Sequence, residues 1–318
     1  MDRFATGLRG AQATIRDLLE RTSRTFALSI PLLPEPTQNA LALAYLLFRV
    51  TDTVEDAAHW SRDERVAALE ELLPIFRTVD IARARTASRQ WVERDVTRDE
   101  GCRDLLLAFP ALLEEVSTWE PVRVRIVCDH AARTAEGMAQ TLREADAAGR
   151  VRLRSLPALR AYCYVVAGIV GELVTALFVN DAPTLVSVKE TLVRHERAFG
   201  EALQLVNILK DERADAQDGR NYLPPSVPRD EVVALARADL DEARAYIAAL
   251  SAAGAPAGYV AFTTLPVELA ERALTQVEKR GAGAKVPRAS VLSLVARIQE
   301  RVRSAATVGA LEESSDGT

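Results

Sequence analysis

Three acidic residues directly follow an almost purely apolar run, ALALAYLLF, that has the length and content of a buried helix. They are Asp52, Glu55 and Asp56. Tyr45, Arg49 and Asp52 fall at offsets 0, 4 and 7, and Asp56 follows at offset 11. In a helix with 3.6 residues per turn these offsets form one narrow stripe. Because acids at the mouth of a hydrophobic core are costly unless they are paired, the stripe indicates that these carboxylates hold a cation.

A second stripe of polar residues occurs in the segment GEALQLVNILKDERADAQDGRNYLPP. Gln204, Asn207, Asp211 and Asp215 fall there at offsets 0, 3, 7 and 11. Two carboxylates one helical turn apart repel each other by roughly a few tenths of a kcal/mol when exposed, and by more in apolar surroundings. Each pair therefore requires a cation. Oxygen ligands without a nearby His or Cys indicate Mg²⁺, which commonly combines one or two carboxylates with substrate phosphates.

A solvated helix face is the alternative explanation for any single acid pair of this kind. Two pairs, each at the end of an apolar helix and each with uncharged polar residues on the same stripe, favour a functional site. An EF-hand is a poor alternative because neither segment contains an Asp-x-Asp-x-Asp-Gly loop.

The elements that must position these stripes are predicted to be helices. Ala, Leu, Glu and Arg dominate the sequence, the β-branched residues follow helical periods, and no Asn-Gly or Asp-Gly hairpin signal occurs. We expect an all-α fold, with a helix from Thr37 through the first acids toward Ala58. Further helices are expected at 62–78, 104–118, 121–145, 156–179, 184–216, 229–252, 256–279 and 288–306. Residues 80–103 are only partly periodic, and a helix there would have a mobile flank. We expect one domain over 1–306 and a disordered tail over 307–318.

Composition narrows the class of protein and its compartment. The chain has 318 residues, 48% of them hydrophobic, and a net charge of −5 with Lys and Arg scattered among the acids, which argues against nucleic-acid binding. Cys102, Cys128 and Cys163 have no metal-binding spacing, and an odd count favours free core thiols in a reducing compartment. We see no apolar leader at the start and no run of about 18 uncharged apolar residues. We therefore expect a cytoplasmic protein.

Several blocks together resemble the squalene/phytoene synthase family of head-to-head prenyltransferases, which act in isoprenoid (terpenoid) biosynthesis. The blocks are SRTFALSI, YLLFRVTDTVEDA, EGMAQTL, YCYVVAGIVGELVTALF and ALQLVNILKDERADAQDGRNYLP, in the family's order over roughly residues 20 to 300. The resemblance implies the isoprenoid synthase fold, a single bundle of helices around a central cavity that the two acid-bearing helices face. It implies that Mg²⁺ is held by Asp52, Glu55, Asp56, Asn207, Asp211 and Asp215 against the diphosphate of a prenyl substrate.

The resemblance also assigns roles to residues beside the acids. Substrate-binding positions would be Ser23, Arg24, Arg49, Gln204, Asn207, Arg220 and Tyr222. The guanidinium groups suit phosphate oxygens. Catalytic positions would be Tyr45, Arg49 and Tyr162. The two tyrosines match positions near the reacting carbons, where a tyrosine hydroxyl could relay a proton; an ordinary buried tyrosine is the alternative for Tyr162. Gly168 and Gly171 either admit a prenyl chain close to the backbone or let two helices approach, and we favour the second.

Within the family, the sequence most resembles squalene synthases. FTTLPVELAERAL followed by GAKVPR resembles their C-terminal region, in which Lys285 and Arg288 would contact the phosphates of NADPH, although simple loop charges are the alternative. Such an enzyme joins two farnesyl diphosphates through presqualene diphosphate and reduces the product to squalene. GRNYLP is instead typical of phytoene synthases, so phytoene or dehydrosqualene synthase, with the same condensation and no hydride transfer, is the alternative.

A non-catalytic prenyl-binding helical protein is disfavoured because it would be expected to have broken acid stripes, and both stripes are intact. A head-to-tail elongase or a terpene cyclase would normally show DDxxD or NSE-type motifs, which we do not find. We expect a monomer or weak dimer, and an oily product favours peripheral contact with a membrane.

Overall fold

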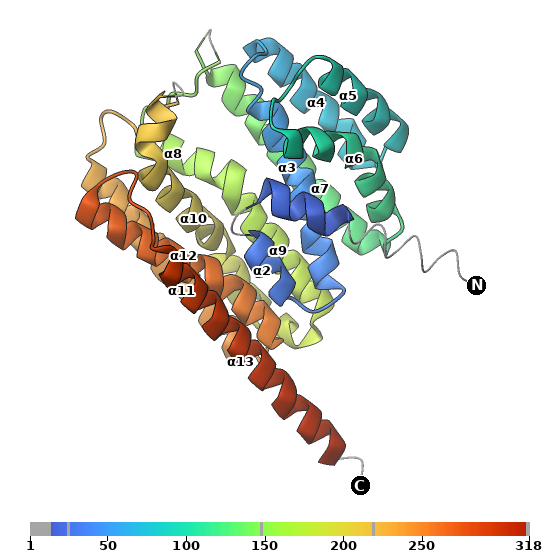
Figure 1. Ribbon diagram of the computed structural model, residues 1–318, viewed down its shortest axis with the longest axis vertical. Coiled ribbons are helices and arrows are strands. Elements are labelled where there is room, and N and C mark those ends of the chain that lie inside the picture. The colour runs from blue at the N-terminus through green and yellow to red at the C-terminus, as the bar shows by residue number, and fades with distance from the viewer. Residues whose placement is uncertain (1–13, 24–25, 147–148, 218–219, 316–318) are drawn as a thin grey trace. The chain divides into compact units, whose positions relative to one another are not determined.

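A computed structural model describes residues 14–23, 26–146, 149–217 and 220–315, and the side chains of these up to 305. Its regular elements in these ranges are helices, which confirms the predicted all-α fold (Figure 1). The chain forms two compact units. The N-terminal unit contains the chain up to Ala27 together with Asn39–Arg152, and the C-terminal unit contains Leu28–Gln38 together with the chain from Leu153. A single domain over 1–306 stays a prediction.

The N-terminal unit is built around the apolar helix that leads to the first acids. This helix is α3 (Thr37–Glu55), and it is followed by α4 (Arg62–Thr78), α5 (Ile81–Glu93), α6 (Glu100–Ser117) and α7 (Pro121–Glu144). Residues 14–22 are helical as well. Leu43, Leu46 and Leu47 of α3 are completely buried, because hydrophobic residues occupy most of the helix surface and must be covered by neighbouring helices. Tyr45, Arg49 and Asp52 are only partly buried, so the polar stripe is the less covered side of an otherwise buried helix.

The partly periodic stretch 80–103 contains α5 and the start of α6. Asp80 caps α5 by accepting a hydrogen bond from the backbone of Arg83 (2.9 Å). Trp91, on the inner face of that helix, is buried. Asp99 caps α6 by accepting from the backbone of Cys102 (2.8 Å), so α6 begins at Glu100, four residues before the predicted start at 104. Short polar side chains thus set both helix starts.

The C-terminal unit contains the second acid-bearing helix. Its elements are η1 (Ile30–Leu32), α8 (Leu156–Cys163), η2 (Tyr164–Gly168), α9 (Ile169–Asp181), η3 (Pro183–Val188), α10 (Lys189–Gln217), α11 (Arg229–Ala252), α12 (Ala257–Arg280) and α13 (Arg288–Ser315). The short helix α2 (Phe26–Ser29) lies at the junction of the two units in the sequence. The helix predicted over 156–179 is interrupted, because η2 is one turn of wider π-helix between α8 and α9.

Two glycines allow the η2–α9 segment to lie directly against α10. A Cβ atom on Gly171 would lie 2.0 Å from the carbonyl oxygen of Glu196, and one on Gly200 would lie 2.0 Å from that of Ala167. Real Cβ atoms do not approach backbone oxygens so closely, so only glycine permits this packing. The prediction that Gly171 lets two helices approach is confirmed.

α13 packs alongside α12 (Figure 1). Leu294 and Ile298 of α13 are buried against Ala261 and Leu265 of α12 and against Leu32. The helix continues to Ser315, whereas we expected it to end at 306 and a disordered tail to follow. Ala, Leu and Glu in the last turns have high helix propensity, which accounts for the extension.

The segment Leu156–Asp181 is long and apolar enough to cross a membrane by length and composition, with a mean hydropathy of 1.9. We expected no such segment because Glu172 interrupts the uncharged run. Its close packing against α10 and the hydrogen bond between the Thr175 and Tyr246 hydroxyls (2.9 Å) are typical of a core helix. The three cysteines are buried and free, as predicted.

Candidate functional site

The first acid stripe is held in place by an arginine on the same helix. The Arg49 guanidinium lies 3.6 Å from the Asp52 carboxylate, one turn along α3. Its other terminal nitrogen lies 3.6 Å from the sulfur of Cys102 in α6. Its Nε is buried and has no hydrogen-bond partner in the part of the chain that the structure describes. Arg49 therefore has donor capacity left for an anion.

The environment of Asp52 disfavours its charged form. The side chain keeps 37% of its surface exposed. Protein atoms nevertheless surround the carboxyl closely enough that burial raises the pKa of Asp52 to about 6; Arg49 opposes this shift and Asp56 adds to it. An acid that is desolvated and repelled by a neighbouring carboxylate is stabilised by an added cation. This is the electrostatic behaviour expected of a metal ligand.

The other two acids of the stripe lie at the end of α3. The helix ends at Glu55, short of the predicted Ala58, yet the Asp56 backbone N–H still donates to the carbonyl of Asp52 (2.8 Å) and so continues the helical register. The buried Arg65 donates to the Glu55 carbonyl (3.0 Å) and to that of Gly149 (2.9 Å). Arg65, which the sequence analysis missed, thus satisfies a terminal helix carbonyl and fixes the end of α3.

Tyr45 and Ser23 lie near each other at the other end of the stripe. The Tyr45 hydroxyl donates to the carbonyl of Thr22 (3.0 Å), and its ring lies 5.3 Å from that of Phe26. Burial raises the pKa of Tyr45, while a hydrogen bond with Ser23 and the charge of Arg49 lower it. The Ser23 oxygen accepts from the backbone of Phe26 (3.1 Å), which leaves its hydroxyl proton for another acceptor. Arg24 lies outside the described residues.

In the second stripe a lysine links two of the predicted metal ligands. Lys210 donates to the side-chain oxygen of Asn207 (3.0 Å) and lies 3.2 Å from the Asp211 carboxylate. The ammonium group neutralises this part of the stripe, and it would have to move aside or be shared when a metal binds. Gln204 lies on the same helix, half-buried. Sequence reasoning overlooked Lys210, although its offset of 3 from Asn207 places it on a neighbouring face.

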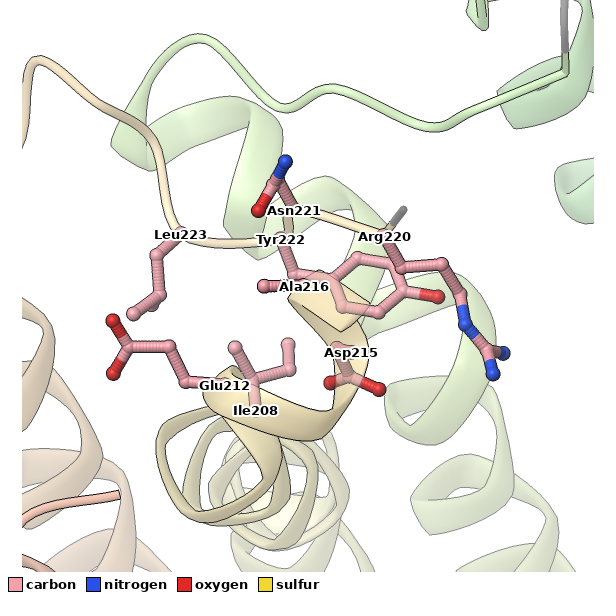
Figure 2. A pocket seen from close by; sticks show the side chains of 8 residues that line it. All are labelled: Ile208, Glu212, Asp215, Ala216, Arg220, Asn221, Tyr222 and Leu223. Carbon is pink, nitrogen blue, oxygen red and sulfur yellow. The ribbon is translucent and has the colours of Figure 1, made fainter. Parts of the chain in front are cut away.

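A pocket of about 150 Å³ opens where α10 ends. Figure 2 shows Asp215 in the last turn of the helix, with Arg220 and Tyr222 of the following segment beside it. The chain folds back here because the Arg220 backbone donates to the carbonyl of Asp215 (2.7 Å). The remaining lining residues are Ile208, Glu212, Ala216, Asn221 and Leu223. The structure therefore brings together three of the predicted site residues, an acid, a guanidinium and a tyrosine.

Tyr162 joins this pocket through an aromatic contact. Its ring stacks on that of Tyr222, with centroids 4.8 Å apart and planes inclined by 19°. Tyr162 is 8% exposed and Tyr222 is 9% exposed. The pair forms an apolar wall with a negative π-face, which is suited to a hydrocarbon chain or a carbocation.

Lys285 and Arg288 lie on the loop between α12 and α13 and at the start of α13. Both are exposed, and neither has an ion-pair partner among the residues that the structure describes. The loop is attached to α10, since the Gly283 backbone donates to the carbonyl of Lys210 (2.7 Å). Gly281 and Gly283 both have positive φ (81° and 86°), which explains why glycines occur there. The loop thus reaches the helix of the second stripe, next to Asp211.

The side chains of the two stripes can bind Mg²⁺ only if water or a bound phosphate supplies the remaining ligands. In the described ranges no three His, Cys, Asp or Glu side chains gather closely enough to hold a metal by themselves. Each stripe supplies carboxylates one turn apart, and Mg²⁺ commonly takes one or two carboxylates and completes its octahedron with water and phosphate oxygens. The residues therefore fit a metal that arrives with, or is completed by, a phosphorylated ligand. That the two stripes face a shared central cavity stays a prediction.

Comparisons with known proteins agree on the family. The family model for squalene/phytoene synthase matches residues 19–231. The squalene synthase of Yarrowia lipolytica is 30% identical over 216 residues, which cover 66% of this chain and 45% of that protein. The squalene synthase of Schizosaccharomyces pombe is 26% identical over 214 residues, covering 66% and 43%. The matches span less than half of the length of these relatives.

Solved structures share the fold. TcSQS in complex with a ligand superposes with a TM-score of 0.72 at 20% identity, covering 92% of this chain and 89% of the other. A dehydrosqualene synthase in complex with a ligand gives 0.54 at 20% identity, covering 92% and 96%. The chain therefore belongs to the squalene/phytoene synthase family and has its all-α isoprenoid synthase fold.

Proposed function

We propose that this protein is a squalene synthase that joins two farnesyl diphosphates head to head. The supporting observation is a set of residues that occurs twice, an acid, a guanidinium and a tyrosine. Asp52, Arg49 and Tyr45 form it on α3, and Asp215, Arg220 and Tyr222 form it at the end of α10. Two such sets suit two substrates that each carry a diphosphate and an oily chain.

Each set would act on the leaving diphosphate. Bound Mg²⁺ would supply positive charge to the departing oxygens, with Asp52, Glu55, Asp56, Asn207, Asp211 and Asp215 as its protein ligands. In each set the guanidinium group, that of Arg49 or that of Arg220, would donate to oxygens of the diphosphate that the set holds. The allylic C–O bond breaks and its electron pair leaves with the diphosphate. A double bond of the second prenyl chain then attacks the cation, and one proton is lost as the cyclopropane of presqualene diphosphate closes.

Tyrosines beside the site have two tasks in this reaction. Their ring faces stabilise the cation, and their hydroxyls can carry the released proton away. The stacked Tyr162–Tyr222 pair also excludes water, which would otherwise capture the cation as an alcohol.

The second half-reaction would use NADPH. When bound, NADPH would supply the hydride that converts the rearranged cation from presqualene diphosphate into squalene. Lys285 and Arg288 would bind the cofactor's phosphates, because both are exposed cations on a loop attached to α10. The peripheral membrane contact, the cytoplasmic location and the monomeric or weakly dimeric state are part of the same proposal.

Phytoene or dehydrosqualene synthase is the second candidate, favoured by the sequence GRNYLP, whose residues 220–223 line the pocket. The experiment that separates the two is incubation of purified protein and Mg²⁺ with farnesyl or geranylgeranyl diphosphate, with and without NADPH. Mass spectrometry should find squalene from the C15 substrate only when NADPH is present. Phytoene from the C20 substrate, with no squalene under any condition, would overturn the squalene assignment.

A further inference from the structure

A buried carboxylate on α10 connects two arginines from different parts of the C-terminal unit. The side chain of Glu201 is completely buried. One of its oxygens is bonded to Nε of Arg197, a turn earlier on α10. Its other oxygen lies 3.1 Å from the guanidinium of Arg160 on α8. Arg160 also lies 3.4 Å from Asp239 of α11, which is 4% exposed.

The contribution of this cluster to the stability of the fold does not by itself account for its presence. Two acids and two arginines balance in charge, but buried ion pairs often contribute little net stability because each ion loses its hydration. One oxygen of Asp239 has no hydrogen-bond partner among the described residues, and the second oxygen of Glu201 has only its ion pair with Arg160. Carboxylate oxygens left in this state cost free energy. We therefore ask which part of the fold the cluster holds in place.

What the cluster holds is the segment around Tyr162. Arg160 lies two residues before Tyr162 on α8. The guanidinium of Arg197 lies 4.3 Å from the ring centroid of Tyr164, which is the first residue of the π-helical turn η2. Through Arg160 and Arg197, Glu201 is thus connected to residues before and after Tyr162 in the sequence.

The far end of the π-helical turn rests on the same cluster. A Cβ atom on Gly168 would lie 2.7 Å from the Tyr164 ring and 3.4 Å from the carboxylate of Glu201. Both ends of η2 are thus packed against Glu201 and its partners. A π turn is rarely retained without a functional reason, because it widens the helix and weakens its hydrogen bonds.

Tyr162 connects the segment held by Glu201 to the pocket. Its ring stacks on Tyr222, and Tyr222 lines the pocket with Asp215 and Arg220. A contact series thus runs from a carboxylate in the core to the wall of the pocket, within one unit of the chain.

We infer that Glu201 is a positioning residue: through Arg160 and Arg197 it fixes the segment 160–164 so that Tyr162 stacks on Tyr222 at the pocket. The structural part of this inference is independent of the reaction, whereas its catalytic consequence rests on the proposed function. Tyr162 would be misplaced when Glu201 loses its charge, because a neutral amide binds a guanidinium more weakly than a carboxylate does.

The structural part is tested by ¹⁹F NMR of protein that contains fluorotyrosine. The chain has six tyrosines, so six resonances are expected, and Tyr162→Phe and Tyr222→Phe assign the two of interest. Glu201→Gln should shift or broaden both. Glu268→Gln is the matched control, because Glu268 also binds two arginines, Arg272 (2.9 Å) and Arg297 (2.8 Å), on α12 and α13. The control should leave both resonances in place.

If Glu201→Gln leaves the two resonances as unchanged as Glu268→Gln does, the inference is wrong. Should Glu201→Gln fail to fold, Arg197→Gln replaces it, since that side chain is 48% exposed and its removal frees the Tyr164 ring. This variant must then move the Tyr162 resonance, and an unmoved resonance overturns the inference.

The catalytic consequence is tested by a double-mutant cycle. Glu201→Gln should lower kcat roughly tenfold or more at little change in KM, and its effect should not add to that of Tyr162→Phe, because both remove the same contribution. Additive losses would show that Glu201 does not act through Tyr162. If the wild-type protein consumes no prenyl diphosphate at all, the proposed function fails, and the NMR comparison still decides the positioning role.

Discussion

The guanidinium of Arg49 lies 3.6 Å from the carboxylate of Asp52, and yet the pKa of that acid is raised to about 6. An arginine at this distance normally lowers the pKa of an acid. Desolvation is the larger effect at Asp52, and the nearby Asp56 adds to it. The first stripe is therefore short of positive charge even with Arg49 present.

Neutralising one acid of either stripe should stop the reaction without unfolding the protein. Asp52→Asn and Asp215→Asn each delete a metal charge rather than a packing contact, so we expect turnover to fall roughly a hundredfold or more while Tm does not fall below that of the wild type. Release of inorganic diphosphate measures turnover. Asp241→Asn, at an acid with 70% of its side chain exposed on α11, is the control. Near-normal rates of the first two variants at saturating Mg²⁺ would refute the metal assignment.

The pKa of Asp52 predicts how the stability of the metal-free protein depends on pH. Since the pKa rises from its usual 3.8 to about 6 on folding, the folded state binds a proton that the unfolded state releases between these values. The contribution of the protonated acid is complete below the lower value and is lost as the pH rises through the upper one. Asp52→Asn should therefore raise Tm at about pH 7.5 and change it little at about pH 4, measured in EDTA. An equal shift at both pH values would contradict the desolvation of Asp52.

Mg²⁺ and a non-hydrolysable prenyl diphosphate analogue should stabilise the protein cooperatively. Each stripe provides only part of an octahedral site, so phosphate oxygens complete the coordination that the carboxylates begin. We expect the increase in Tm with both ligands to exceed the sum of the increases with each alone. Purely additive shifts in thermal denaturation would indicate that metal and diphosphate bind independently.

Neutralising Lys285 and Arg288 together should separate the two half-reactions. Only the second half-reaction uses the nicotinamide, so the loss of cofactor phosphate contacts should slow the reduction and spare the condensation. Presqualene diphosphate or dehydro-products should accumulate in mass spectrometry of the Lys285→Gln, Arg288→Gln protein. Unchanged squalene output at a limiting NADPH concentration would show that the two residues are ordinary loop charges.

Gly171→Ala should destabilise the C-terminal unit, by roughly 1–3 kcal/mol or more, as overpacking of a core does. The added methyl group would meet a backbone oxygen at 2.0 Å, which cannot move without shifting α10. Chemical denaturation measures the change. Gly101→Ala is a suitable comparison, because its Cβ would lie 3.2 Å from the nearest atoms and requires only a small adjustment. A smaller loss for Gly171→Ala than for Gly101→Ala would contradict the close approach of the two helices.

Local patterns were sufficient to predict most helices and both acid stripes. The helical period places Asp52 and Asp56, or Asp211 and Asp215, on one face without any knowledge of tertiary structure. The starts of α5 and α6 were less accessible, although the caps Asp80 and Asp99 are visible in the sequence once their role is known.

Contacts between distant segments could not be predicted in this way. Glu201 looks like one polar residue in an apolar helix, and nothing near it in the sequence indicates that Arg160, 41 positions earlier, neutralises it. The π-helical turn is hidden for the same reason, since its residues fit the ordinary helical period and only packing against Arg197 and Gly200 distinguishes it. Arg65 likewise finds its acceptors, the carbonyls of Glu55 and Gly149, through the fold alone.

α10 is a single uninterrupted helix of 29 residues, so it sets a fixed distance between the residues that it carries. At 1.5 Å per residue, the buried Glu201 and the pocket residue Asp215 are separated by about 21 Å along its axis. No hinge within it can absorb a change in length. Inserting one residue between Gln204 and Asp215 would turn everything beyond it by about 100°, and Asp215 would leave the stripe that begins at Gln204. Side chains between Glu201 and Asp215 can therefore be substituted, but the number of residues between these two positions is fixed.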